Sequence, residues 1–324
     1  MRLKSLAPFS TPFAALCCFS LILISSVGQT SAVAASHTRP KITGISHIAI
    51  YASDPDATNH YYVNVIGAAR EADPENPQGV RYAINATQFV EVLPLPANAG
   101  INRLDHTGWK TDNAEGMRLY LAGKGWKTPD TVTHNSDGSK SLRVDDPEGN
   151  VVEFVQPSPR AMAPHAPNEV GHHMIHVGFL VHSRAAEDKF YVDLLGFRPY
   201  WFGGMKEDKV DWVSQQTPDS HDWLEYMLTS GPSGTGIPAT MSQQTLGVLD
   251  HVSIGVVSVP EAYKKLAAEN RLTGRVDKEP KIGRDGKYQF NMYDPDGIRL
   301  ELMEFHATDK PCCSQFTAED PKAE

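Results

Sequence analysis

"DDPEGNVVEF" at residues 145–154 and "YDPDGIRLEL" at residues 293–302 are two closely similar sequences in one chain. Each begins with Asp-Pro-acid-Gly, a turn in which proline presets φ and glycine takes the left-handed position. Each continues as an alternating strand with a glutamate at its centre. Because a strand sends neighbouring side chains to opposite faces, that glutamate faces away from its apolar neighbours. The pair predicts a repeated hairpin whose second strand carries a functional carboxylate.

Four strand-like openings, each with a histidine near its start, show that the repeat is fourfold. Each is followed by an apolar pattern of helical period. Three of the helical patterns reach a glycine suited to a helix C-terminus, and the fourth ends at Asn270. Each unit closes on a glutamate-bearing strand. The openings are "ISHIAIYA" (45–52), "LDHTGWKT" (104–111), "MIHVGFLV" (174–181) and "LDHVSIGV" (249–256), and the closing strands are "TQFVEVLP" (87–94), "NVVEFVQP" (150–157), "DWLEYML" (222–228) and "IRLELMEF" (298–305).

The unit is therefore a strand, a helix and two or three further strands, about 50 to 60 residues long. This predicts an α+β fold built from four βαβββ modules. The stretch rich in proline and alanine at 157–171 is typical of a linker, so we expect domains at 42–156 and 172–306, followed by a polar tail at 307–324. The units could pair one with two and three with four, or one with four and two with three.

Strand alternation places one histidine and one glutamate of each unit on the same face. A single strand histidine is usually only hydrogen-bonded, but a fourfold repeat of the pair favours metal binding. Two paired units would gather two histidines and two carboxylates, which suit a divalent ion such as Fe²⁺, Ni²⁺, Mn²⁺ or Zn²⁺. We expect two sites, with a single surviving site as the alternative. The predicted ligands are His47, Glu91, His106, Glu153, His176, Glu225, His251 and Glu301.

The composition limits the partners. The chain has 324 residues and a formal net charge of −9, without a basic run, so a nucleic-acid partner is not expected. A small-molecule substrate fits better, and a homodimer is possible. Of four cysteines, Cys17 and Cys18 lie near the N-terminus. The vicinal pair Cys312 and Cys313 receives no role, although a bridge to a partner and a soft-metal site stay open.

Residues 1–35 have the pattern of a secretory signal peptide. Arg2 and Lys4 precede an apolar stretch, and Ala32-Val33-Ala34 fits the small-x-small cleavage pattern. We therefore expect export to a periplasm or to the exterior, with no membrane segment left after cleavage. An uncleaved N-terminal anchor is the alternative.

At these residues the chain resembles the vicinal oxygen chelate superfamily, which holds glyoxalase I, extradiol dioxygenases and antibiotic-resistance binders. The resemblance covers about residues 42–306 and is strongest at "DPDGIRLEL" (294–302) and "LDHVSIGV" (249–256). It implies that paired units form cup-shaped domains. It also implies a metal on each floor, with ligands from the first and last strands.

The ligand set looks like that of glyoxalase I. The resemblance implies a lyase or isomerase in which Glu153 and Glu301 bind the metal and shuttle a proton while an enediolate is stabilised. The glutathione-binding arginine of that enzyme is replaced by Tyr51 and Leu180. Lactoylglutathione is therefore not the expected substrate, and another small carbonyl compound is.

Two alternatives stay open. A ring-cleaving dioxygenase would use His176, His251 and Glu301, but its acid/base tyrosine falls on Asn291, two residues before Tyr293. A non-catalytic protein that sequesters a drug or metallophore would need aromatic walls, for which Trp109, Trp212, Trp223, Tyr82 and Tyr288 are candidates. An acidic substrate could contact Arg81, Arg143, Arg284 or Lys287, although each is also explained as a solvated strand-end charge.

Overall fold

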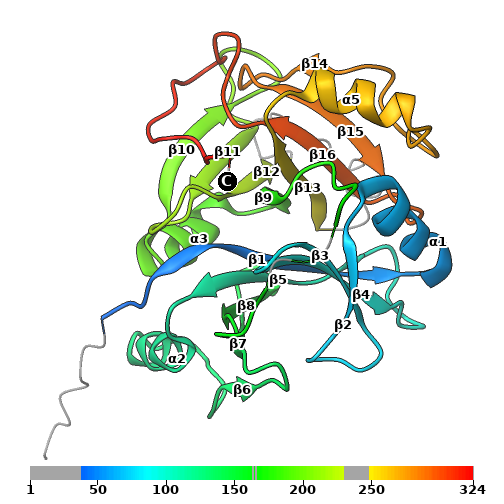
Figure 1. The fold of residues 1–324 in the computed structure, drawn as a ribbon. Helices are drawn as coiled ribbons and strands as arrows, with labels where there is room; N and C mark the ends of the chain where they lie inside the picture. The colour runs from blue at the N-terminus through cyan, green and yellow to red at the C-terminus, as the bar shows by residue number, and fades with distance from the viewer. Residues whose placement is uncertain (1–37, 163, 165, 230–247, 324) are drawn as a thin grey trace, which may run out of the picture. The chain divides into compact units, whose positions relative to one another are not determined.

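Two curled eight-stranded sheets, one from each half of the chain, form the fold (Figure 1). The computed structural model describes residues 38–162, 164, 166–229 and 248–323. The predicted leader at 1–35, with Cys17 and Cys18, lies outside the described residues. Few helices accompany the sheets, so the fold class is α+β, as predicted.

The first sheet has the strand order β2-β3-β4-β1-β5-β8-β7-β6. Its central pair is antiparallel, and each central strand has its own unit's closing strand parallel beside it. The strands are β1 (Ile42–Ala52), β2 (Ala69–Ala72), β3 (Val80–Asn85), β4 (Gln88–Pro94), β5 (Leu104–Thr111), β6 (Thr133–His134), β7 (Lys140–Asp145) and β8 (Val151–Gln156).

The second sheet repeats this order as β10-β11-β12-β9-β13-β16-β15-β14. Units one and two therefore share one sheet, and units three and four share the other, which resolves the pairing that the sequence left open. The strands are β9 (His173–Val181), β10 (Arg198–Gly203), β11 (Trp212–Gln216), β12 (Trp223–Leu228), β13 (Leu249–Val256), β14 (Lys281–Ile282), β15 (Tyr288–Tyr293) and β16 (Arg299–Glu304).

The helices lie where the apolar period predicts them. They are α1 (Pro55–His60) running into the π-helix η1 (Tyr61–Ile66), α2 (Ala114–Gly123), α3 (Arg184–Asp188) running into the π-helix η2 (Lys189–Leu194), and α5 (Val259–Ala268). Within two residues of its end, each helical segment is followed by a residue with positive φ, namely Gly67, Gly125, Gly196 or Asn270. In the described part of the chain, no helix is long and apolar enough to cross a membrane.

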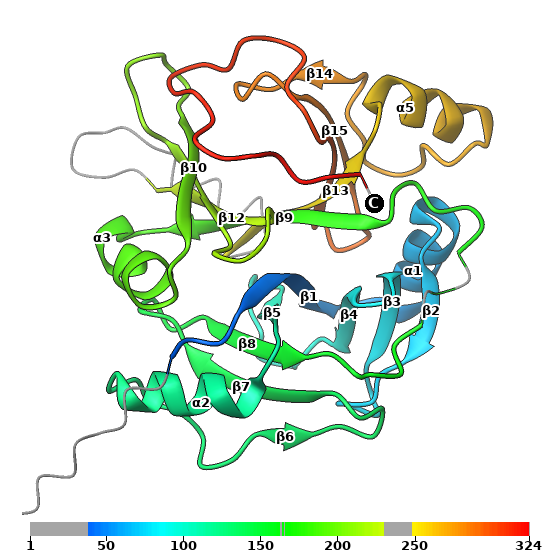
Figure 2. The same ribbon diagram turned by 60° about the vertical axis from the view of Figure 1, so that its left-hand side comes forward.

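The helix-bearing faces of both sheets share one hydrophobic core. The predicted inward residues Ile48 and Phe154 of the first half join Val177 and Leu300 of the second half in this core. Figure 2 shows α1 and α3 beside the opposite halves of the chain. The domain bounds at 42–156 and 172–306 stay our proposal, because one core serves both sheets.

Contacts between helices link unit two with unit three and unit four with unit one. Tyr120 of α2 donates its hydroxyl to the carbonyl of Leu194 at the end of η2, at 2.6 Å. Arg271, just after α5, donates to the carbonyl of Val65 in η1 at 2.6 and 2.9 Å. Units two and three, and units four and one, are therefore linked through their helices, while the sheets link one with two and three with four.

The two Asp-Pro-acid-Gly turns have the predicted conformation. Gly149 and Gly297 both have a φ of 85°. Asp146 accepts the backbone N–H groups of Glu148 and Asn150, and Asp294 accepts that of Ile298 at 2.8 Å. The turns fix the register of β8 and β16. In β16, Glu304 therefore faces the helix side, where its carboxylate accepts the N–H of Val259 at the start of α5.

A buried polar seam joins the central strands of the two sheets. The Gln88 amide accepts from the N–H of Met174 at 2.8 Å and donates to its carbonyl at 2.9 Å. The Asp222 carboxylate accepts the Ile45 N–H at 2.8 Å and lies 2.8 Å from His173 Nε2. These contacts replace a backbone ladder between β1 and β9, and buried polar groups need such partners.

The seam predicts a large loss of stability for Asp222→Ala, because the buried N–H of Ile45 would lose its acceptor. We expect a fall of about 2–4 kcal/mol in the free energy of unfolding, measured by urea denaturation. The matched control is Asp219→Ala, since exposed Asp219 accepts the N–H of Ile42 at 2.8 Å and should cost about 1 kcal/mol. Equal losses in the two variants would contradict this role of the seam.

Candidate metal centres

The first centre joins His47 of β1, His106 of β5 and Glu153 of β8. His47 Nε2 lies 2.8 Å from His106 Nε2, and Glu153 Oε2 lies 3.0 Å from His106 and 3.3 Å from His47. All three side chains are buried. The first centre thus brings together residues from two units of the same sheet.

The second centre joins His176 of β9, His251 of β13 and Glu301 of β16. The two Nε2 atoms lie 2.7 Å apart, and the three ligand atoms all lie within 4.8 Å of one another. Within the described residues, these two centres are the groups of three or more metal-ligating side chains that come together.

Glu91 and Glu225, the remaining predicted ligands, lie beside the centres. Glu91 Oε2 is 3.5 Å from His106 Nε2 and 3.8 Å from His47 Nε2. Glu225 Oε2 is 3.4 Å from His251 Nε2. The structure therefore places all eight predicted residues at the two centres, six of them in the tight groups.

The donor spacing of the first centre fits a divalent ion. A metal bound at about 2.1 Å holds ligands at right angles about 3.0 Å apart. The three donor atoms of the first centre are 2.8, 3.0 and 3.3 Å apart. In addition, buried Glu91 receives no hydrogen bond from an N–H or hydroxyl group in the described part of the chain, and its carboxyl group lies near that of Asp73. Buried carboxylates in this state are what a cation would satisfy.

Two glycines make the close approach of the histidines possible. A Cβ added to Gly108 would lie 2.2 to 2.9 Å from the ring atoms of His47, and one added to Gly178 would lie 2.2 to 3.1 Å from those of His251. Each glycine stands two residues after the other histidine of its centre, in "HTG" and "HVG". This pattern was visible in the sequence but was not used in predicting the site.

One histidine in each centre stacks on an aromatic ring that has a cation nearby. His47 stacks on Phe89 at 4.6 Å, and the Arg81 guanidinium lies 4.0 Å above Phe89. His176 stacks on Trp223 at 4.4 Å, and Lys287 Nζ lies 5.1 Å from Trp223. These layers fix the orientation of both imidazoles.

The surroundings shift the pKa values of the four ionisable residues of the first centre in different directions. Burial lowers the pKa of His47 to about 4. Burial opposes the shift of His106, but the hydrogen bonds to Asp105 and Glu153 raise its pKa to about 9. Burial likewise opposes the shift of Glu153, whose pKa is held well below its usual value by His106 and His47. Burial and the neighbouring Asp73 raise the pKa of Glu91 to about 9.

Three residues support the first centre in a way that the sequence analysis does not predict. Asp105 Oδ1 lies 2.6 Å from His106 Nδ1, an arrangement that fixes the tautomer of a metal-binding histidine. Tyr51 donates its hydroxyl to Asp105. Glu75 comes from the loop after β2 and accepts from Arg81 at 2.8 Å. No local pattern marks Glu75, whereas the "DH" pair at 105–106 is a recognisable signal.

Each centre opens into a cavity. The first pocket, of about 400 Å³, is lined by Glu75, Glu91, Arg143 and Glu153 among others. Arg143 Nε donates to Glu153 Oε1 at 3.2 Å. The second pocket, of about 310 Å³, is lined among others by Trp201, Trp212, Glu225, His251, Arg284 and Glu301.

Some of the aromatic and cationic residues proposed to contact a ligand line a pocket, and others are buried in the core. Trp212 lines the second pocket. Trp109 does not reach either pocket, since it is fully buried against Phe197 in the shared core. Lys287 is also fully buried, and its Nζ donates to Asp320 at 2.8 Å. The solvated-charge interpretation of Lys287 is therefore wrong.

Comparisons with known proteins agree with this architecture. The model of the Glyoxalase/Bleomycin resistance protein/Dioxygenase superfamily matches residues 173–302, and the first sheet repeats the strand order of that region. Residues 173–302 therefore match a domain of this superfamily, and the equal strand order of the two sheets fits two cup-shaped domains of this kind in tandem. No curated protein matches the chain in sequence.

Among solved structures, the chain is similar to the 2,3-dioxygenase LapB from Pseudomonas sp. KL28, with a TM-score of 0.61 and 15% identity over 85% of this chain and 97% of that one. It is similar to homoprotocatechuate 2,3-dioxygenase from Brevibacterium fuscum, with a TM-score of 0.58 and 16% identity over 87% and 84%. It is also similar to the Mn(II)-bound glyoxalase from Novosphingobium aromaticivorans, with a TM-score of 0.60 and 17% identity over 82% and 83%. At this identity the likeness concerns the fold.

The glycine contacts predict that Gly108→Ala weakens metal binding at the first centre. The new methyl group would push the His47 ring out of line, and we expect a loss of about 10–100-fold in affinity, measured by titration with Mn²⁺. Gly123→Ala is the control, because a Cβ there meets nothing within 4 Å. Unchanged affinity in a folded Gly108→Ala protein would contradict the contact.

The charges of the first centre predict a pH dependence of metal affinity. Below pH about 9 the metal-free His106 carries a proton that a metal must displace, so affinity should rise about tenfold per pH unit between 6.5 and 8.5. Mn²⁺ titration across this range measures the slope. In Asp105→Asn, which removes one cause of the raised pKa of His106, the slope should be shallower. A flat profile in the wild type would refute the prediction.

Proposed function

We propose that the protein is a divalent-metal-dependent enzyme that isomerises or cleaves a small carbonyl substrate in the manner of glyoxalases, with a substrate other than lactoylglutathione. One observation carries the proposal. In each centre a second glutamate lies 3.4 or 3.5 Å from a histidine nitrogen of the His/His/Glu group. Two imidazoles and two carboxylates per centre supply both metal ligands and a group that moves a proton.

The metal would act as a Lewis acid that polarises the substrate carbonyl. The chain's own residues would position the substrate and move the proton. Arg143, at the mouth of the first pocket, offers a cation to an oxygen-rich substrate. Tyr51 and Asp105 hold His106 in its ring orientation.

The two glutamates of the first centre are engaged differently. Both oxygens of Glu153 are in use, because Oε2 contacts the histidines and Oε1 accepts from Arg143. Glu91 receives no hydrogen bond from an N–H or hydroxyl group in the described part of the chain, and burial and the neighbouring Asp73 raise its pKa to about 9. The resemblance to glyoxalase I implies that Glu153 and Glu301 move the proton. The contacts favour Glu153 as a ligand and Glu91 as the carboxylate that exchanges the proton.

Substitution of these glutamates tests the proposal. The wild type should hold about two ions per chain by elemental analysis. Glu153→Gln should lose the ion of the first centre, because it removes a ligand. Glu91→Gln should keep that ion and lose turnover at the first centre. Activity is measured as isomerisation of hemithioacetals and of aldoses to ketoses, in a Glu301→Gln background that isolates the first centre. A wild type without bound metal would refute the enzyme proposal.

A ring-cleaving dioxygenase is the second candidate. Two histidines and one carboxylate are the ligand set typical of non-haem iron oxygenases, and the tight groups contain that set. Oxygen consumption with catechols after anaerobic loading with Fe²⁺ distinguishes the two reactions. Oxygen uptake without isomerisation would replace the first proposal by the second, and tight ligand binding without turnover would favour a sequestering protein.

A further inference from the structure

The segment after β16 packs on the second sheet, although its composition is that of a polar tail. The Phe316 ring lies 4.9 Å from the Tyr200 ring, and the Thr317 N–H donates to the Tyr200 carbonyl at 3.0 Å. Asp320 accepts from buried Lys287 at 2.8 Å. In Figure 2 this segment, drawn in red, runs over the second sheet between β10 and β14. These contacts anchor the far end of the segment.

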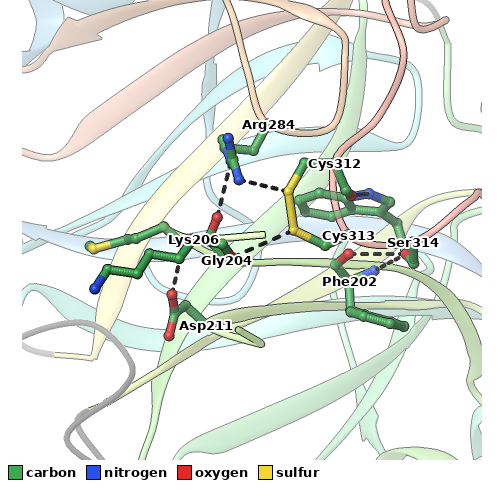
Figure 3. Close-up of a disulfide and its surroundings, with 10 residues drawn as sticks. Phe202, Gly204, Lys206, Asp211, Arg284, Cys312, Cys313 and Ser314 are labelled. Carbon is green, nitrogen blue, oxygen red and sulfur yellow. Dashed lines mark hydrogen bonds between the residues drawn. A yellow bond between two sulfur atoms is a disulfide. The ribbon is translucent and has the colours of Figure 1, made fainter. Parts of the chain in front are cut away.

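Nearer to β16, a disulfide joins the neighbours Cys312 and Cys313 and lies beside Arg284, Gly204 and Phe202 (Figure 3). Arg284 Nη2 lies 2.7 Å from Cys312 Sγ, and its Nε donates to the Gly204 carbonyl at 3.0 Å. Trp201 Nε1 donates to the Cys312 carbonyl at 3.2 Å. Trp201 and Arg284 both line the second pocket. Cys312 therefore contacts two residues that line the cavity leading to the second centre, Arg284 through its sulfur and Trp201 through its carbonyl.

The backbone at the disulfide explains how its reduction would loosen these contacts. Cys313 has a φ of 73°, a region that residues with a Cβ rarely occupy. The ring closed by two adjacent cysteines holds it there. Ser314, the next residue, is bound through its hydroxyl to both the N–H and the carbonyl of Phe202 at 2.9 Å. Without the ring, residue 313 can return to negative φ, which turns Ser314 away from β10.

The first sheet lacks this device. The segment that follows β8 contains no cysteine. Residues 157–158 and 160–162 border a cavity of about 410 Å³ together with Phe89, which stacks on His47 as Trp223 stacks on His176. The two halves of the chain therefore differ in how their concave faces are closed.

We propose that the Cys312–Cys313 pair is a redox site that controls access to the second pocket. In the oxidised form the disulfide holds Trp201 and Arg284 against the terminal segment. In the reduced form residues 312–314 leave the rim and the pocket widens. The inference deepens the proposed function, on which it rests for what the pocket leads to.

The chemistry requires a dithiol reductant. One thiolate of the reductant attacks a sulfur of the Cys312–Cys313 bond, and its second thiolate then displaces the protein thiol. The S–S bond of the protein breaks, that of the reductant forms, and two electrons and two protons pass to the cysteines. An exposed disulfide is open to this exchange, and both cysteines are partly exposed.

Hydrogen exchange measured by mass spectrometry tests the proposal without any metal. The full chain is compared before and after reduction with dithiothreitol. Peptides covering 200–206, 283–287 and 311–314 should exchange about tenfold faster or more in the reduced protein. Peptides covering 317–323 should not change, because Phe316 and Asp320 stay anchored. The double variant Cys312→Ser/Cys313→Ser should match the reduced protein with and without reductant.

The first sheet is the internal control, and its peptides at 81–92 and 140–155 should exchange equally in both forms. Equal exchange at 200–206 and 283–287 in oxidised and reduced wild type would overturn the proposal, whatever the variant does. Faster exchange everywhere would also overturn it, since the disulfide would then stabilise the whole fold.

Removal of Zn²⁺ by a chelator adds a functional readout. In a Glu153→Gln background, which should leave the ion of the second centre, release of Zn²⁺ to EDTA should be about tenfold faster after reduction by a phosphine. Equal release in both forms would contradict control of access. A protein that binds no Zn²⁺ would refute the proposed metal function, while hydrogen exchange would still decide the redox site.

Discussion

The contact between an imidazole ring and a bare backbone is the constraint on which both centres depend. His47 lies against Gly108, and His251 lies against Gly178, at distances that no Cβ permits. Because each of these strands has a glycine at that point, the Nε2 atoms of the facing histidines can come within 2.8 Å of each other. The aromatic ring on the other side of His47 then leaves a single orientation. The geometry of the ligands is thus set by the sheet itself.

Strand pairing within the sheets and helix contacts between the sheets have different roles in the fold. Strand pairing within each sheet gathers the ligands of one centre from two neighbouring units. Helix contacts between the sheets, such as Tyr120 with Leu194, join the units in the opposite combination and make one core. The seam at Gln88 and Asp222 fixes the central strands against each other. All four units therefore contribute to the one core on which both sheets pack.

Much of this could be predicted from the sequence, because the signals are local. Strand alternation placed Glu153 and Glu301 opposite their apolar neighbours, and turn chemistry marked the hairpins before them. The pairing of units could not be predicted, since the partner of a strand is decided by contacts distant in the chain and every unit offers the same ligands. Glu75 lies in a loop without a pattern, and it reaches the first centre through its ion pairs with Arg81 and Arg143. The burial of Lys287 was hidden for a similar reason, because the residue that pairs with it, Asp320, lies in a stretch of polar composition.

The shared core has a consequence for the history of such a chain. After a duplication, two copies that folded separately could diverge until one was lost. Here Phe197 of the second half packs on Trp109 of the first, and Arg271 of the second on the backbone of Val65. Deleting either half would expose to water the apolar surface that the other half buries against it. A half whose chemistry had become redundant would still be retained as a structural partner, free to acquire a closure of its own kind.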